Sequence, residues 1–93
     1  MVNQGSASAN DYLLLDQVLA KSGDLSDSIR ALKSGLSIAP YNNFLYQKLA
    51  LRQFSSGDSA AAQETIRRGL ALHPEDTILR NMQEEAAREG FVH

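Results

Sequence analysis

The stretch G-L-S-I-A-P, from Gly35 to Pro40, decides the fold because it recurs 34 residues later as G-L-A-L-H-P, from Gly69 to Pro74. Each stretch is typical of the end of a helix, since proline lacks an N–H group and clashes with the preceding turn. The repetition of this helix-ending pattern after 34 residues indicates that the chain contains two copies of a helical unit.

The similarity between the two units extends over most of their length. A shift of 34 residues superimposes nine positions of similar character without a gap. These positions are Tyr12 with Tyr46, Leu15 with Leu49, Gly23-Asp24 with Gly57-Asp58, Leu32 with Ile66, Gly35-Leu36 with Gly69-Leu70, Ile38 with Leu72, and Pro40 with Pro74. Fixed periods of about 20–50 residues mark stacked supersecondary units, so the sequence predicts a repeat protein.

Two Gly-Asp pairs, at 23–24 and 57–58, predict the turn inside each unit. Glycine readily adopts the left-handed conformation that ends a helix. The aspartate after it can accept hydrogen bonds from the free N–H groups of the next helix. Asn42 and Asp76 occupy the same capping position before the helices that follow the two proline stretches.

The chain is predicted to be all-α, because the apolar residues recur at helical intervals, as in Tyr12, Leu15 and Leu19. No segment alternates long enough to predict a strand. Five helices are expected, over residues 10–22, 26–39, 43–56, 59–72 and 76–89. The domain organisation is a flexible lead-in over 1–9 and a single domain over 10–91, with repeat 1 at about 9–42, repeat 2 at about 43–76 and a capping helix at about 77–89.

This combination of period, early aromatic, Gly-Asp turn and closing proline resembles the tetratricopeptide repeat. The resemblance covers residues 9–74 as two units, and 75–91 resembles the extra solvating helix of such arrays. It implies a right-handed α-α superhelix of about five antiparallel helices. The residues expected to pack within and between repeats are Tyr12, Leu15, Leu32, Gly35, Pro40, Tyr46, Leu49, Ala50, Ala62, Ile66, Gly69 and Pro74.

Some residues depart from the family's pattern. Asp16 stands where a small residue usually packs between the paired helices, and Gln53 replaces a usual aromatic residue. Either Asp16 is tolerated because the first helix lacks a neighbour on one side, or the first hairpin packs loosely. In the last helix Arg80, Gln83 and Glu84 replace apolar and small residues, so this helix is expected to close the stack.

Gly35 and Gly69 lie inside predicted helices, where glycine costs about 0.5–1 kcal/mol relative to alanine. One interpretation is close approach of the next helix, with Tyr46 near Gly35. The other is drift from alanine, which the family often has at this position.

The resemblance also implies that the first helix of each pair lines a concave groove for a protein or peptide segment. The corresponding residues are Leu13, Gln17, Ala20, Lys21, Phe44, Gln47, Leu51, Phe54, Ser55, Ile78, Asn81 and Glu85. Phe44, Leu51 and Phe54 share one helical stripe, which either packs against neighbouring helices or forms an apolar floor for a ligand. A carboxylate clamp like that of one subclass is not expected, because Lys48 alone matches it.

The overall composition excludes several classes of function. The net charge is −2 and the basic residues are scattered, so no nucleic-acid partner is expected. The chain has no cysteine, no secretory signal pattern and no apolar run long enough for a membrane span, which favours a cytoplasmic location and no membrane partner.

No catalytic or metal-binding constellation is expected. His73 stands at a helix end, His93 is terminal, and neither lies at a helical spacing from Ser55 or Ser56. Adjacent carboxylates such as Glu84 and Glu85 point about 100° apart on a helix. The sequence therefore predicts a non-enzymatic domain without a cofactor.

Two functions remain open. The first is a protein-interaction module that presents a partly apolar groove to a peptide or protein segment. The alternative is a structural or self-associating end piece of a longer array, because fewer than three full repeats are short for independent stability.

Overall fold

A computed structural model describes residues 8–92, with side chains up to residue 88, and within this range the chain is all-α as predicted. The described residues form five helices: α1 (Ala9–Lys21), α2 (Leu25–Ile38), α3 (Asn43–Ser55), α4 (Ser59–Leu72) and α5 (Thr77–Val92). The predicted boundaries agree to within one residue, except that α5 continues to Val92 and does not end at residue 89.

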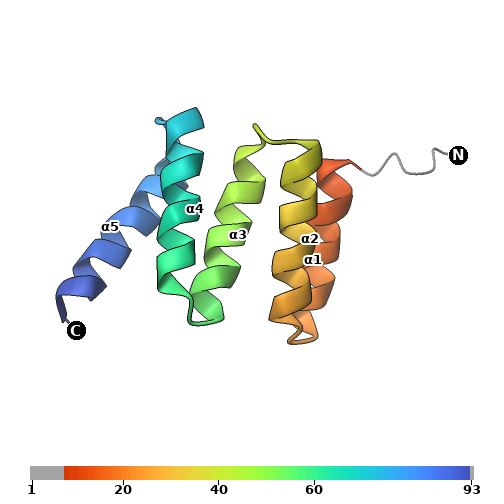
Figure 1. The fold of residues 1–93 in the computed structure, drawn as a ribbon, viewed down its shortest axis with the longest axis horizontal. Coiled ribbons are helices and arrows are strands. Elements are labelled where there is room, and N and C mark those ends of the chain that lie inside the picture. The colour runs from red at the N-terminus through yellow and green to blue at the C-terminus, as the bar shows by residue number, and fades with distance from the viewer. Residues whose placement is uncertain (1–7, 93) are drawn as a thin grey trace, which may run out of the picture.

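Consecutive helices pack side by side as antiparallel neighbours along the chain (Figure 1). In addition, α1 contacts α3 and α3 contacts α5. The helices α1, α3 and α5 therefore form one continuous layer, and α2 and α4 both pack against one face of it.

The first helix begins one residue earlier than the predicted start at residue 10. Residues 1–7 lie outside the described residues, but Ala9 is already helical. The Ser8 N–H donates to the Asp11 carboxylate at 2.8 Å, which satisfies a group that a helix start otherwise leaves unpaired. This local hydrogen bond begins the helix earlier than the apolar pattern indicates.

The turns inside the two hairpins confirm the role of both glycines and of one aspartate in the Gly-Asp pairs. Gly23 and Gly57 have φ of 84° and 87°, the left-handed region that favours glycine. Asp58 caps α4 by accepting from the Ala61 N–H at 3.1 Å. Asp24 holds the same position before α2, but its side chain makes no capping hydrogen bond, so that part of the prediction is wrong.

The connections after α2 and α4 also follow the sequence pattern. Asn42 accepts hydrogen bonds from the N–H groups of Phe44 and Leu45 at 2.9 and 3.2 Å, and so caps α3. Pro40 and Pro74 lie two residues beyond the ends of their helices and are exposed. These prolines terminate helices and do not contribute to the packed interior.

The core consists of two clusters that repeat along the stack. Leu32, Leu45 and Leu49 form the first cluster between the first hairpin and α3. The second joins α3, α4 and α5 and contains Tyr46, Ala50, Ile66 and Leu79. Leu32 is equivalent to Ile66, and Leu45 is equivalent to Leu79. The 34-residue period of the sequence therefore corresponds to a repeated set of core contacts.

Gly35 and Gly69 are positions of close helix approach. A Cβ atom at Gly35 would lie 3.0 Å from the Tyr12 Cβ and 3.0 Å from the Leu45 Cδ2. At Gly69 it would lie 3.0 Å from the Tyr46 Cβ and 2.7 Å from the Leu79 Cδ1. Close approach is confirmed, but the aromatic residue beside Gly35 is Tyr12, because Tyr46 packs on the glycine of its own hairpin.

Asp16 does not leave the first hairpin loosely packed. It is fully buried, accepts a hydrogen bond from the Ser28 hydroxyl and forms an ion pair with Arg52 of α3. Gln53, the other departure, is also buried and accepts from the Thr65 hydroxyl at 2.6 Å. Both polar residues are therefore tolerated because partners from neighbouring helices satisfy them.

The outer side of α1 is uncovered. The repeat alignment predicts that Leu15 packs as Leu49 does, but Leu15 is 44% exposed whereas Leu49 is 4% exposed. Leu49 lies in a cluster with Leu32 of α2, and no preceding helix occupies that place beside α1 within the described residues.

Candidate functional site

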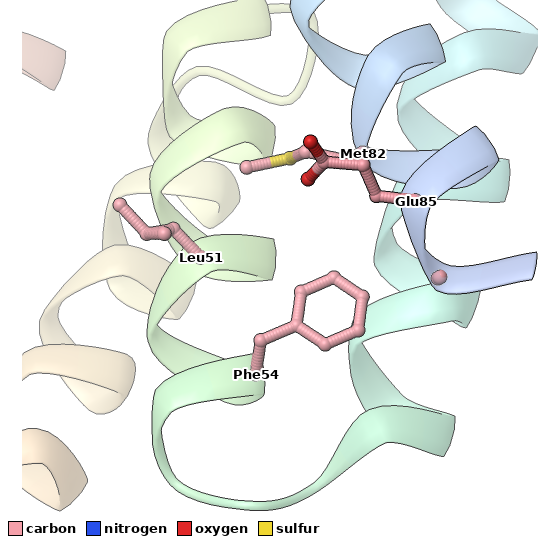
Figure 2. A pocket seen from close by; sticks show the side chains of 5 residues that line it. Leu51, Phe54, Met82 and Glu85 are labelled. Carbon is pink, nitrogen blue, oxygen red and sulfur yellow. The ribbon is translucent and has the colours of Figure 1, made fainter. Parts of the chain in front are cut away.

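One concavity of the structure is a hollow between α3 and α5. Its volume is about 330 Å³, and it is lined by Leu51, Phe54, Met82, Glu85 and Ala86. In Figure 2 the Phe54 ring points from the end of α3 toward α5, while Met82 and Glu85 extend from α5 toward α3. The walls therefore come from two helices of the odd-numbered layer.

Helical geometry explains why these side chains meet. Leu51 and Phe54 are three residues apart on α3, and Met82 and Ala86 are four apart on α5, so each pair shares one face of its helix. Phe54 and Met82 are half-buried and pack on the cluster around Tyr46. Leu51 is 39% exposed, so its side chain remains available for contact.

The hollow combines apolar side chains with polar surface, which includes one anionic group. Leu51, Phe54 and Met82 supply aliphatic, aromatic and thioether surface, and Glu85 is the charged residue of the lining. A volume near the lower end of the ~300–1,000 Å³ typical of ligand pockets suits one large side chain.

Three residues of the groove predicted from the sequence line this hollow: Leu51, Phe54 and Glu85. Phe44 and Ile78 are equivalent positions at the starts of α3 and α5 and are 56% and 49% exposed. Outside the hollow, Ser55 and Asn81 are exposed.

The predicted residues of α1 do not join the hollow. Leu13 is half-buried and packs on the cluster of Leu32, Leu45 and Leu49, so it belongs to the core. The other three have no place in the lining: Gln17 and Lys21 are exposed, and Ala20 is half-buried.

Met82 and Ala86 are lining residues that the sequence-based groove omits. The signal for them was present, because Ile78, Met82 and Ala86 recur every four residues on one face of α5. The polar replacements Arg80 and Glu84 lie on the opposite, exposed side of this helix, whereas Gln83 lines a concavity shared with α4.

A polar network holds α3 and α5 in register. The Asp76 carboxylate, 8% exposed, accepts hydrogen bonds from the side-chain amides of Asn43 and Gln47, each at 2.8 Å. It also caps α5 by accepting from the Leu79 N–H at 2.9 Å. Gln47, predicted as a groove residue, therefore serves this network.

The same contacts set the ionisation of Asp76. Burial raises the pKa of its carboxyl group, but the Leu79 N–H and the two amides donate to the charged form and outweigh the burial. The pKa consequently lies below its usual value, and the ionised form makes these contacts between α3 and α5.

Among residues 8–88, no group of three or more His, Cys, Asp or Glu side chains is arranged to hold a metal ion. His73 is half-buried, and its ring nitrogen contacts the Tyr41 carbonyl oxygen. None of the helices in the described part of the chain is long and apolar enough to span a membrane.

No protein-family model matches this chain, and no curated protein matches it in sequence.

Proposed function

We propose that this chain is a protein-interaction domain of the tetratricopeptide-repeat type. Two findings support the repeat assignment: the Gly35 contacts with Tyr12 and Leu45 recur at Gly69 with Tyr46 and Leu79, and the helices pack in sequence. In repeats of this type the first helices of the pairs line the ligand-binding side, which corresponds to the layer of α1, α3 and α5.

The observation that carries the binding function is the hollow between α3 and α5. The hollow accepts an apolar side chain of a partner segment, with Leu51 and Phe54 as the main contact surface. Glu85 favours a lysine or arginine close to that apolar residue, because an opposite charge at the rim increases specificity and the rate of encounter.

A peptide selection tests this proposal and does not require the partner to be identified first. The immobilised chain is exposed to a library of random peptides, and the enriched peptides are expected to share one large apolar residue with a basic neighbour. The dissociation constants of these peptides are then measured with the parent chain and with Leu51→Ala.

Leu51→Ala is expected to weaken binding by about fivefold, because full burial of a leucine contributes ~1.5–3 kcal/mol and only part of Leu51 is free to be covered. Leu72→Ala is the matched control, since Leu72 is 40% exposed on α4, away from the hollow. Peptides that bind Leu51→Ala and the parent equally would place the binding site elsewhere.

A further inference from the structure

The outer side of α1 carries an exposed apolar row distinct from the hollow. Leu14, Leu15 and Val18 are 62%, 44% and 55% exposed, and their spacing places them along one side of the helix. Exposed apolar residues scattered singly are ordinary, whereas three neighbouring ones on a single helix face form a candidate contact surface.

The second hairpin shows that two of the three row residues are not needed for internal packing, since only Leu15 has a core equivalent, Leu49. The residues equivalent to Leu14 and Val18 on α3 are Lys48 and Arg52, and both are half-buried without being apolar. Internal packing of the stack therefore does not require apolar residues at these positions. Their presence on α1 points to an additional contact on that side.

The charges at the two ends of the row identify the occupant. Asp11 is exposed before the row, and Lys21 is exposed after it. When two copies of α1 pair antiparallel, Asp11 of each copy lies near Lys21 of the other, and Leu14 lies opposite Val18. A parallel pair would bring like charges together, which is unfavourable.

We propose that this face binds the same face of a second copy of the chain, with the two α1 helices antiparallel. Such a contact is isologous, since the same residues act on both sides of a two-fold axis. The helix dipoles of the two copies also oppose one another in this arrangement.

The expected dimer is weak. A 13-residue helix is about 20 Å long at ~1.5 Å per residue, so one helix from each copy buries less than the ~1,200 Å² of a standard stable interface. Sedimentation equilibrium from about 10 µM to 1 mM should show the average mass rising from the monomer toward the dimer at ~0.1 mM and above.

The double variant L14Q/V18Q removes the two most exposed apolar side chains of the row without touching the core. It should raise the dissociation constant at least about tenfold and leave the helical circular dichroism and melting temperature unchanged, because both side chains are exposed in the monomer. Ile38→Gln is the matched control, because Ile38 is 51% exposed on α2, and it should dimerise like the parent.

Charge reversal tests the antiparallel arrangement. Asp11→Lys and Lys21→Glu each place like charges at both ends of the pair, so each variant alone should dimerise about tenfold more weakly. An equimolar mixture of the two restores opposite charges at both ends and should recover the parent affinity. Since Asp11→Lys also removes the Ser8 hydrogen bond, recovery on mixing separates the charge effect from damage to the helix start.

Three results would overturn the proposal: a monomer at every concentration, a dimer that L14Q/V18Q leaves intact, or no recovery on mixing. A monomer would assign the face to a different partner, such as an amphipathic helix of another protein. The peptide-binding function is separable, since Leu51→Ala is expected to dimerise normally and L14Q/V18Q to bind the selected peptides normally.

Discussion

The Arg52 guanidinium on α3 forms a two-point ion pair with the Asp16 carboxylate on α1, with Nε 2.8 Å from Oδ1 and Nη2 3.2 Å from Oδ2. Asp16 is fully buried, and the Arg52 side chain is 17% exposed. The other ion pairs of the described residues each lie within one helix. This pair therefore fixes the position of the first hairpin relative to the second.

Arg52→Ala is expected to lower the free energy of unfolding by about 3 kcal/mol, because it leaves a buried carboxylate without its counter-charge. The double variant D16A/S28A should lose much less, since it removes both buried polar groups and installs the alanines found at the equivalent positions 50 and 62. Urea denaturation followed by circular dichroism measures both.

Arg30→Ala is the control for this comparison, because Arg30 pairs with Asp27 at 3.5 Å on an exposed surface of α2. It should change stability by no more than about 0.5 kcal/mol. Equal losses for Arg52→Ala and Arg30→Ala would contradict the structural role of the buried pair.

Gly69→Ala is expected to lower the melting temperature by about 4–8 °C, equivalent to roughly 1 kcal/mol for a domain of this size. The added Cβ meets Leu79, which is fully buried and has little room to move, and this overpacking exceeds the gain in helix propensity. Gly35→Ala should be milder, because the closest atoms to its added Cβ, in Tyr12 and Leu45, lie at 3.0 Å and not at 2.7 Å. A higher melting temperature for Gly69→Ala would show that the glycine is not required for close approach.

Asp76→Asn should alter the pH dependence of stability. A depressed carboxyl pKa contributes stability above the pKa of the unfolded chain, and this contribution is lost as the pH falls through the folded pKa. The parent should therefore lose stability on acidification below about pH 4, and Asp76→Asn should show a shallower loss over the same interval.

At pH 7 Asp76→Asn should also be less stable by about 1–2 kcal/mol, since an amide cannot accept as many hydrogen bonds as the carboxylate. Asp58→Asn serves as a comparison at pH 7, because asparagine caps a helix nearly as well as aspartate. Identical acid profiles for Asp76→Asn and the parent would exclude Asp76 as a contributor.

The two Gly-Asp turns make a matched pair for helix capping. Asp58→Ala removes the acceptor of the Ala61 N–H and should lower stability by about 1 kcal/mol. Asp24→Ala should have less than half of that effect, because the Asp24 side chain makes no capping hydrogen bond. Thermal melts of the two variants at the same concentration check the difference, and equal losses would contradict it.

Helix positions were predictable because their signals are local. The left-handed glycines at 23 and 57 and the prolines at 40 and 74 specify where the chain turns, independently of tertiary contacts. The exposure of Leu15 was not predictable from the alignment. It depends on whether a helix precedes α1, which a repeat pattern does not state.

The polar contacts between hairpins were beyond sequence reasoning for a different reason. Asp16 and Arg52 are 36 residues apart, and their meeting depends on the angle between two hairpins. An acidic residue among the packing positions indicates that another side chain must pair with its carboxylate, but the sequence does not show which one. Part of the lining of the hollow was predictable from the sequence. Leu51, Phe54 and Glu85 occupy the repeat positions that line the predicted groove, whereas Met82 and Ala86 could be found only from the apolar spacing within α5.

The two ends of the stack are chemically unlike: the outer side of α5 presents Arg80 and Glu84, whereas α1 presents leucines and a valine. The stack of helices is therefore easier to extend at its N-terminal end than at its C-terminal end. A helical hairpin grafted ahead of Ala9 would meet an apolar surface on which it could pack. A hairpin added after α5 would require the charged residues on that helix to be replaced first.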